Sequence, residues 1–564
     1  MYNNPVKTAV HLFLNAMPIT KAAYRKRKIS IILCYLALTL TACSFGTETN
    51  VSVGNRTQTL HFGNGDEPQE LDPHVTTGIP EWHIQHAVFE GLVGKNPETL
   101  AIEPGVAESW TVSEDLKTYT FHFRDNARWS NGDTVTAGDF VYSWNRALTP
   151  VLGNLYAYMF YPIKNAQAYF EGEITDFNLV GVRALDERTL MVELNAPTPY
   201  FLQLMDHHSY FPVHPPTIER FDAFSERGTR WTRPGNFVGN GPFMLKDWKL
   251  NRILSIEKSP TYWDADKVRL QEIYFYPISN NTTEERMFRA GQLHITDKVP
   301  NEKIAVYRKN QPDALRITPY LGTYFYRFNT TVKPLDNPRV RLAMAMCINR
   351  EQIVELITKG GQIPAYTFTP PDTNGYTATG RLPFDPVAAK KILAEAGYPD
   401  GKNFPKLEII FNSDEAHRKI AIAIQEMWKK SLNISVTLSN LDWKVYLDRE
   451  SSMDYQISRA AWIGDYVDPT TFLDMFITGG GNNRTGWSSP RYDTLIQTAA
   501  MTGDRAERYA LLQEAENILL NGVPIVPIYT YTQVRLISPS VKGWHYNILD
   551  QHTFKYVHLD DSYQ

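Results

Sequence analysis

Apolar residues alternate with polar ones in several short segments of the chain. Residues 118–124 (TYTFHFR) place Tyr119, Phe121 and Phe123 on one face and polar side chains on the other. Residues 189–194 (TLMVEL) alternate in the same way. A period of two is typical of a strand with one buried face, so both segments are expected to be strands.

Other segments have the spacing and the end residues of helices. Residues 385–397 begin with Asp385, which can cap a helix, and end with Gly397, which suits the left-handed residue after a helix. Residues 504–519 also begin with an Asp, and Asp504 and Glu507 could form a capping box. Because strand-like and helix-like segments interleave throughout, an α/β or α+β fold is expected.

The first 42 residues differ from the rest of the chain. They contain six Lys or Arg residues, and no Asp or Glu occurs before Glu48. Behind this basic cluster, residues 29–40 (ISIILCYLALTL) form an apolar run of 12 residues. Such a run is too short to span a bilayer as a helix and suits the hydrophobic region of a signal peptide. We therefore expect the protein to be exported.

The apolar run ends in LTAC at residues 40–43, which resembles the lipobox of bacterial lipoprotein precursors. Cys43 is then the expected mature N-terminus, with a diacylglyceryl group on its thiol, and the alternative is a plain secretory signal with an incidental Cys. The signal is long from Met1 and of ordinary length from Met17, so either can be the start. Ser44 replaces the Asp that retains many lipoproteins at the inner membrane. We expect a location in the periplasm or at the cell surface, with either membrane as the anchor.

Length and charge narrow the class of protein further. The chain has 564 residues, too many for one ordinary core, so two or three domains are expected. Without the basic residues of the signal, 51 basic and 61 acidic side chains give a net charge of −10, which argues against nucleic acid as a partner. Of the three Cys, only Cys43 and Cys347 remain, so with Cys43 acylated Cys347 has no partner for a disulfide.

Motifs of common enzyme classes are missing. No GxSxG, Walker or HExxH pattern occurs. His83 and His86 lie three apart and His207 and His208 are adjacent, but no Cys or carboxylate completes a recognised metal spacing. The glycines at 479–481 are not followed by Lys and Ser or Thr, so a flexible loop is expected there rather than a phosphate site. We expect no metal and no cofactor.

A pattern on the scale of a family covers the mature chain. Residues 105–144 (GVAESWTVSEDLKTYTFHFRDNARWSNGDTVTAGDFVYSW) resemble the signature of the extracytoplasmic solute-binding proteins of peptide and nickel ABC importers. The similarity continues through LDPH (71–74), FEGL (89–92), GNGPFMLKDW (239–248), SPTYWD (259–264), NPRVRLAM (337–344), KKILAEAGYPDG (390–401) and DYVDPTTF (465–472). Within this family the chain is most similar to the oligopeptide-binding proteins.

The resemblance implies an α/β fold of the type II periplasmic-binding-protein class. It has two lobes, an extra domain in the first lobe, and a hinge of two strands that closes on the ligand. The implied domains are residues 1–42 as signal peptide, 43–90 with 214–321 and 533–564 as the core of lobe I, 91–213 as the extra domain, and 322–532 as lobe II. A peptide extended between the lobes needs its backbone N–H and C=O groups paired, so the protein would bind it like an added strand.

Asp465 is the first ligand residue that the resemblance implies. In this family an Asp at the head of the DYxxPTxF-like stretch takes the α-ammonium of the peptide. A buried ammonium needs a desolvated carboxylate as its partner. The alternative is that Asp465 only caps the helix begun by DPTTF, for which Asp468 is better placed.

Further ligand residues follow from the same resemblance. Arg459 or His417 would meet the carboxylate of peptides of different length. Trp443 and Trp462 would form flat walls for ligand side chains, unless they are core residues. The remaining positions expected to face the ligand are Asn412, Ile79, Tyr156, Tyr320, Asn482, Asn483 and Tyr531.

Several residues depart from the family pattern. Arg327 stands where the oligopeptide binders have Glu, and Glu450 where they have Arg. Ala345 replaces a Lys that would anchor the carboxylate of the shortest peptides. If Arg327 pairs with Glu450, that part of the pocket is expected to be neutral. The Cys pair of some relatives is replaced by Gly322 and Ile463, and a specialised ligand such as a cell-wall peptide becomes an alternative to general oligopeptides.

The sequence thus predicts a lipid-anchored, monomeric receptor that captures peptides, delivers them to an ABC permease and catalyses no reaction. A nickel or haem receptor is an alternative among binding proteins. An alternative of another class is a peptidase that uses Asp465 and His417 as acid and base, although no recognised nucleophile or metal motif accompanies them.

Overall fold

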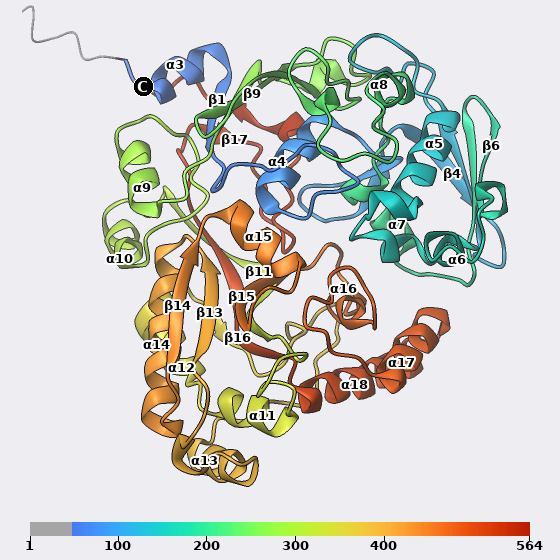
Figure 1. Ribbon diagram of the computed structural model, residues 1–564. Coiled ribbons are helices and arrows are strands. Elements are labelled where there is room, and N and C mark those ends of the chain that lie inside the picture. The colour runs from blue at the N-terminus through green and yellow to red at the C-terminus, as the bar shows by residue number, and fades with distance from the viewer. Residues whose placement is uncertain (1–47, 564) are drawn as a thin grey trace, which may run out of the picture. The chain divides into compact units, whose positions relative to one another are not determined.

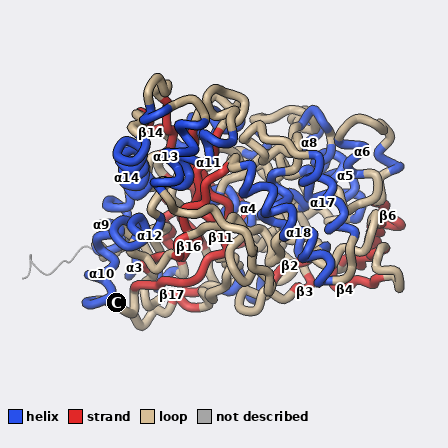
Figure 2. The backbone as a smooth tube through the Cα atoms, turned by 90° about the horizontal axis from the view of Figure 1, so that it is seen from below, coloured by secondary structure: helices blue, strands red, loops and turns tan. Residues whose placement is uncertain are grey.

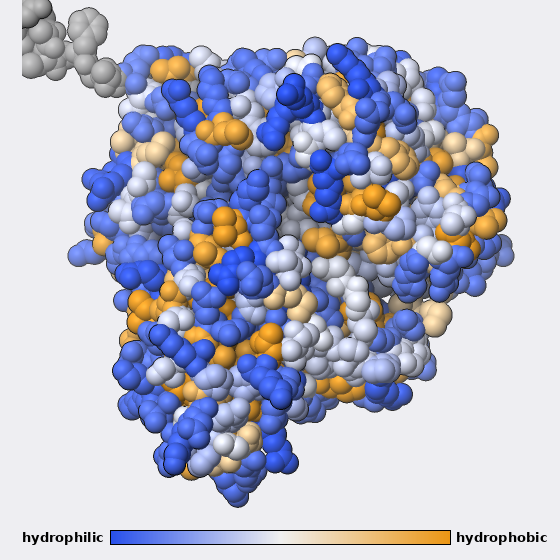
Figure 3. Space-filling model, viewed as in Figure 1, coloured by the Kyte–Doolittle hydropathy of each residue, from blue (hydrophilic) through white to orange (hydrophobic). Residues whose placement is uncertain are grey.

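The computed structural model describes residues 48–563. All elements named below belong to the unit Asn50–Gln564. The predicted signal peptide and Cys43, with its predicted lipid, lie outside the described residues. In the described part of the chain, no helix is long and apolar enough to cross a bilayer. On the face shown in Figure 3, hydrophilic residues predominate and hydrophobic residues form small scattered groups.

The upper part of the molecule is built on a four-stranded sheet with the order β1-β10-β9-β8 (Figure 1). The strands are β1 (Thr59–Gly63), β10 (Glu272–Tyr276), β9 (Ile253–Lys258) and β8 (Phe243–Lys249). β1 is parallel to β10 and the other pairs are antiparallel. Leu60, Phe62, Ile256 and Phe275 are fully or almost fully buried and form part of its core. Strands far apart in the sequence therefore share this layer.

A second four-stranded sheet lies to the right in Figure 1 and has the order β4-β5-β7-β6, antiparallel throughout. Its strands are β4 (Ala107–Val112), β5 (Thr118–Phe123), β7 (Thr189–Glu193) and β6 (Val182–Asp186). The alternation predicted for residues 118–124 is confirmed, because Tyr119, Phe121 and Phe123 are buried while the residues between them are partly exposed. This sheet falls within residues 91–213, and the domain boundaries themselves stay a prediction.

The helices of these two parts are short. α5 (Ala137–Leu148) begins with a capping box, in which the Thr136 and Asp139 side chains each accept a backbone N–H of the other residue. The others are α3 (Asn50–Thr57), α4 (Ile79–Val88), α6 (Ala166–Phe170), α7 (Phe201–Leu204), α8 (Pro215–Arg220), α9 (Asn281–Arg289) and α10 (Asn301–Asn310). Two small hairpin-like pairs join β2 (Val93–Lys95) to β3 (Ile102–Pro104) and β17 (Val541–Lys542) to β18 (His558–Leu559).

The lower part contains a mixed six-stranded sheet with the order β12-β16-β11-β15-β13-β14. The strands are β12 (Ile363–Pro364), β16 (Ile525–Leu536), β11 (Leu315–Phe328), β15 (Ile457–Ile463), β13 (Leu407–Asn412) and β14 (Val436–Leu441). β13 is parallel to β14 and β15, whereas β11 is antiparallel to β15 and β16. Figure 2, seen from below, places α14 and β14 at the opposite end of the molecule from β4 and β6.

Helices surround the lower sheet. They are α11 (Pro338–Met346), α12 (Arg350–Ile353), α13 (Pro386–Glu395), α14 (Glu415–Leu432), α15 (Trp443–Ser451), α16 (Thr470–Leu473), α17 (Pro490–Met501) and α18 (Arg505–Gly522). The two predicted helices are confirmed as α13 and α18. Asp385 accepts the N–H groups of Val387 and Ala388, and Gly397 has a φ of 101°. Asp504 accepts the N–H of Glu507, which is one half of the expected capping box.

Two long strands carry the chain between the upper and lower parts. β11 and β16 pair from Leu315 opposite Leu536 to Arg327 opposite Ile525, with register shifts along the way. At the upper end, the N–H of Leu536 donates to the Thr296 hydroxyl at 2.9 Å. These strands are the only long pair that reaches both parts among the described elements (Figure 1).

Candidate functional site

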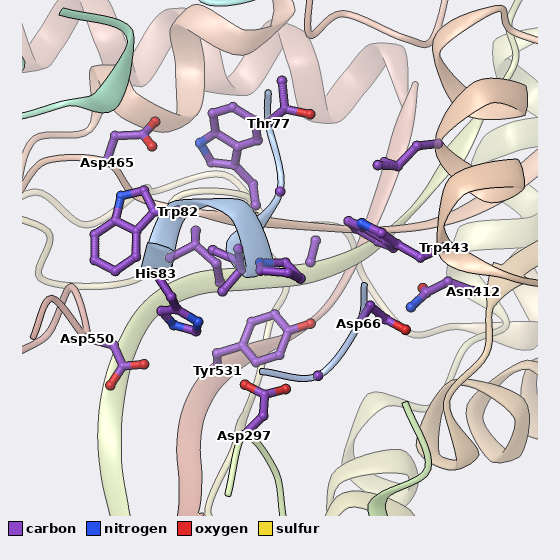
Figure 4. A pocket seen from close by; sticks show the side chains of 18 of the residues that line it. Asp66, Thr77, Trp82, His83, Asp297, Asn412, Trp443, Asp465, Tyr531 and Asp550 are labelled. Atoms are coloured by element: carbon purple, nitrogen blue, oxygen red, sulfur yellow. The ribbon is translucent and has the colours of Figure 1, made fainter. Parts of the chain in front are cut away.

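A cavity of about 250 Å³ lies between the upper part and the lower sheet. Its wall combines residues 64–66, 77–80, 82 and 83 of the upper part with side chains of β15, α15 and the loops around them. Figure 4 shows Asp465 on one side of this pocket and Asn412 with Trp443 on the other. A ligand in the cavity would be enclosed by both parts of the molecule.

Most residues expected to face the ligand line this one cavity. They are Ile79, Tyr156, Tyr320, Asn412, His417, Trp443, Arg459, Trp462, Asp465, Asn482 and Tyr531. Arg327 and Glu450 line it too. Asn483 does not, because its side-chain amide donates to the carbonyls of Phe476, Ile477 and Trp487 and fixes a loop. Ala345 belongs to α11, is fully buried in the core and is also absent from the wall.

Asp465 follows directly after β15 and carries a carboxylate with few partners. The Thr471 hydroxyl donates to Oδ2 at 3.5 Å, and His207 Nε2 lies 3.4 Å from Oδ1. Burial raises the pKa of Asp465 to about 7, although Lys95 and the hydrogen bond from Thr471 lower it. Lys95 itself forms an ion pair with Asp206 at 3.2 Å. Within residues 48–563, no Lys or Arg forms an ion pair with the Asp465 carboxylate, so this group can accept a cation.

Asp468, rather than Asp465, is the residue that holds the start of the helix begun by DPTTF. Its carboxylate accepts the N–H of Thr470 at 3.0 Å, at the start of α16. The same carboxylate forms a buried ion pair with Arg508 at 2.7 Å. Asp468 rather than Asp465 therefore holds this helical turn.

Arg459 presents a buried cation to the same cavity. Its Nη1 donates to Asn412 Oδ1 at 3.2 Å, its Nη2 donates to the Tyr531 hydroxyl at 3.0 Å, and the guanidinium lies 4.8 Å from the ring centre of Tyr324. Nε has no hydrogen-bond partner. Over the described chain, no carboxylate pairs with Arg459. A buried guanidinium without a counter-charge is suited to bind an anion.

His417 lies on α14 and is neutral. Burial lowers its pKa well below the ordinary value, and the nearby Arg459 lowers it further. Neither ring nitrogen has a hydrogen-bond partner. Asp414, 3.7 Å away, is paired with Lys298 at 3.0 Å. His417 contacts Asp414 and the ring of Tyr324, whereas Asp465 contacts Thr471 and His207, so the two residues of the peptidase alternative line the same cavity but have different neighbours.

Trp443 and Trp462 form part of the wall in different ways. Trp443 begins α15 and stacks on Tyr446 with ring centres 5.7 Å apart, and its indole N–H is unpaired. Trp462 donates its indole N–H to the carbonyl of Thr471 at 2.6 Å and is buried beside Tyr156. Trp462 is thus both a core residue and a wall residue.

The charges that depart from the family pattern do form an ion pair. Arg327 Nη1 lies 2.5 Å from Glu450 Oε1, but Arg484 Nη1 also lies 2.9 Å from Glu450 Oε2. The expectation of a locally neutral pocket is therefore wrong, because a second guanidinium joins the pair. Arg484 was not among the predicted site residues.

Other wall residues were also missed by the sequence reasoning. Trp82, Asp66, Asp297 and Lys298 line the cavity from loops and α4 of the upper part. Burial raises the pKa of Asp66 to about 6, against a lowering effect of Lys298. These residues lie in segments without a recognisable spacing, so only their position in space reveals them.

The His pairs noted in the sequence are held by other contacts. His83 Nδ1 lies 3.1 Å from the Asn64 side-chain oxygen, and the rings of His207 and His208 lie 4.1 Å apart. Across residues 48–563, no group of three or more His, Cys, Asp or Glu side chains is arranged to hold a metal ion.

The model of the bacterial extracellular solute-binding proteins, family 5, matches residues 101–484, more than half of the chain. The chain belongs to this family. The oligopeptide-binding protein OppA of Bacillus subtilis is 38% identical over 538 residues, which cover 92% of this chain and 97% of that protein. The predicted family and the two-lobed α/β fold are thus confirmed.

Solved structures of this family indicate how the lobes are arranged. The structure of the Escherichia coli murein tripeptide binding protein MppA has a TM-score of 0.85 at 37% identity, covering 89% of this chain and 98% of that one. The structure of the unliganded open form of MppA aligns with 89% of this chain and 97% of its own, which are similar shares, but its TM-score is only 0.61. The lobes of this protein therefore do not have the arrangement of that open form.

Proposed function

We propose that this protein is an extracytoplasmic receptor that binds short peptides between its lobes and delivers them to an ABC importer. The observation that carries the proposal is the pair of opposite charges in one cavity. Asp465 offers a carboxylate and Arg459 a guanidinium, and among the described residues Asp465 forms no ion pair with a Lys or Arg and Arg459 none with an Asp or Glu. A peptide with free ends supplies an ammonium for the first and a carboxylate for the second.

The same charges give a reason for the lobes to close on a ligand. Burying an unpaired charge is costly, whereas pairing it with hydrogen bonds offsets much of that cost. An enclosed peptide supplies both counter-charges, so it binds the closed arrangement more tightly than the open one and shifts the population toward it. Relatives named for oligopeptides and for murein peptides support this ligand class.

A titration of Ala-Ala-Ala into the purified protein tests the proposal. We expect saturable binding in calorimetry and recovery of the intact tripeptide by mass spectrometry. Appearance of Ala-Ala and Ala would favour a peptidase, and absence of binding to any short peptide would overturn the proposal.

Peptide length is expected to matter. Ala345 is buried in the core and provides no cation where the family pattern has a Lys, so a dipeptide that reaches Asp465 lacks that anchor for its carboxylate. Tripeptides and longer peptides reach Arg459 or the neutral His417. The lost charge-assisted hydrogen bond corresponds to about 1.5–3 kcal/mol, or roughly ten- to hundredfold weaker binding of dipeptides. Titrations of Ala-Ala, Ala-Ala-Ala and Ala-Ala-Ala-Ala side by side measure this, and a dipeptide that binds as tightly as the tripeptide contradicts it.

The proposal includes a lipid anchor at Cys43, in the periplasm or at the cell surface, and a monomeric receptor. It rests on the lipobox-like residues 40–43 and on relatives named as periplasmic proteins. Cys43→Ser is expected to leave unprocessed precursor, which is a larger species on a gel and takes up no radioactive fatty acid. The unchanged protein is the control. Normal processing and membrane attachment of the variant would contradict the anchor.

A further inference from the structure

Three charged side chains form one cluster in the wall of the cavity. Arg327 comes from β11, Glu450 from α15, and Arg484 from the loop before α17. They are 3%, 4% and 7% exposed. Glu450 pairs with both guanidiniums and also accepts hydrogen bonds from the Tyr446 hydroxyl at 2.9 Å and the Ser458 hydroxyl at 3.1 Å. Its carboxylate is therefore fully occupied.

The cluster carries an excess positive charge. Two guanidiniums face one carboxylate, and in the part of the chain that the structure describes neither Arg forms an ion pair with another acidic residue. Arg327 Nε and Arg484 Nε are buried and have no hydrogen-bond partner. A buried N–H without a partner and a buried charge without a counter-charge are both costly. A second carboxylate in the cavity would relieve both costs.

Arg484 of the cluster and Asp465 both lie near Tyr156 in the wall of the cavity. Tyr156 is buried in the wall, and its ring centre lies 6.2 Å from that of Trp462 and 4.4 Å from that of His207, whose Nε2 is 3.4 Å from the Asp465 carboxylate. Burial is the main reason why the pKa of Tyr156 is raised, and the two nearby charges act on it in opposite directions, Asp465 upward and Arg484 downward. Both charges are therefore close to the same hydroxyl.

We propose that Arg327 and Arg484 form a subsite for a carboxylate side chain, Asp or Glu, at the first or second residue of the bound peptide. Glu450 is a positioning residue that holds the two guanidiniums side by side. Bidentate pairing of guanidinium and carboxylate suits this geometry, and a Lys side chain at the same place would be repelled. The inference rests on the proposed function, because it assumes a peptide whose ammonium lies at Asp465.

Matched tripeptides test the subsite. Glu-Ala-Ala, Ala-Glu-Ala and Ala-Ala-Glu are each compared by calorimetry with the Gln isostere at the same position, with Ala-Ala-Ala as reference. We expect at least tenfold tighter binding of the Glu peptide at position one or two, which is about 1.4 kcal/mol. At position three we expect the Glu peptide to bind less than threefold more tightly than the Gln peptide. A preference that is absent at the first two positions, or largest at the third, overturns the inference.

Variants show whether a preference for Glu arises from this cluster or from the overall charge of the protein. Arg484→Gln is expected to reduce the Glu-to-Gln ratio to within threefold, while Glu450→Gln is expected to increase it. Arg491→Gln is the matched control, because Arg491 is exposed and pairs with Glu514 away from the cavity. If thermal unfolding shows that Arg484→Gln does not fold, Arg484→Lys is used instead. This variant keeps the charge, so it is expected to bind the Glu peptide more than threefold more tightly than the Gln peptide.

The outcomes distinguish this inference from the proposed function. Binding of Ala-Ala-Ala without a Glu preference overturns the subsite alone. Failure of every tripeptide to bind overturns the proposed function and the subsite with it. An unchanged Glu preference in folded Arg484→Gln also overturns the subsite.

Discussion

Asp465→Ala is expected to lower the affinity for peptides with a free N-terminus by about 2–5 kcal/mol, as truncation of one side of a buried charge pair does. The loss arises because the ammonium of the peptide is still taken out of water but no longer meets an anion. Calorimetry with Ala-Ala-Ala and its N-acetylated form measures it. The acetylated peptide should bind the wild-type protein weakly. Its affinity should fall only slightly further in the Asp465→Ala variant, because it has no ammonium to lose a partner.

Two controls make this result specific. Asp454→Ala removes a carboxylate that is 75% exposed and lies outside the cavity wall, and it should leave the affinity unchanged. Asp465→Asn keeps the shape of the side chain and removes the charge, and it should weaken binding nearly as much as Ala. Equal affinity of the unchanged protein for free and acetylated peptides would remove Asp465 from the site.

Arg459→Met is expected to weaken tripeptide binding by about 2–5 kcal/mol, because the peptide carboxylate loses its buried cation. The amidated peptide Ala-Ala-Ala-NH₂ should bind the unchanged protein weakly and respond little to the substitution. The unliganded variant should unfold at the same or a higher temperature, since Arg459 has no buried carboxylate that its removal would leave unpaired.

Calorimetry and thermal unfolding of the same samples test both parts of this prediction. Arg491→Met serves as the control, because Arg491 is exposed and is not part of the cavity wall. A variant that binds Ala-Ala-Ala as tightly as the unchanged protein would show that the carboxylate is held elsewhere. Strong destabilisation of the unliganded variant would show that Arg459 is mainly structural.

The secondary structure could be predicted from the sequence wherever its cause is local. The strand at 118–123 follows from alternation, and the helices that begin after Asp385 and Asp504 follow from their capping residues. Gly322 and Ile463, inferred from the family pattern to replace a Cys pair, lie opposite each other in β11 and β15. These features depend on neighbours in sequence or on a family motif, so they are visible without coordinates.

The location of the candidate site could be predicted because its residues lie in or beside motifs of the family. Asp465 begins DYVDPTTF, and Arg459 lies on β15, which ends two residues before Asp465. Which charges balance one another could not be predicted in this way. The pairing of Glu450 with both Arg327 and Arg484 depends on the approach of β11, α15 and a distant loop.

The sequence by itself determined the family, the interleaved strands and helices, and the residues most expected to meet a ligand. The tertiary structure alone decided that, among the described residues, Asp465 forms no ion pair with a Lys or Arg and Arg459 none with a carboxylate, and that the pocket around Glu450 is positive rather than neutral. The physical reason is that burial and electrostatic balance depend on every group within a few ångströms. Most of those groups come from segments far apart in the chain, whose approach no local pattern encodes.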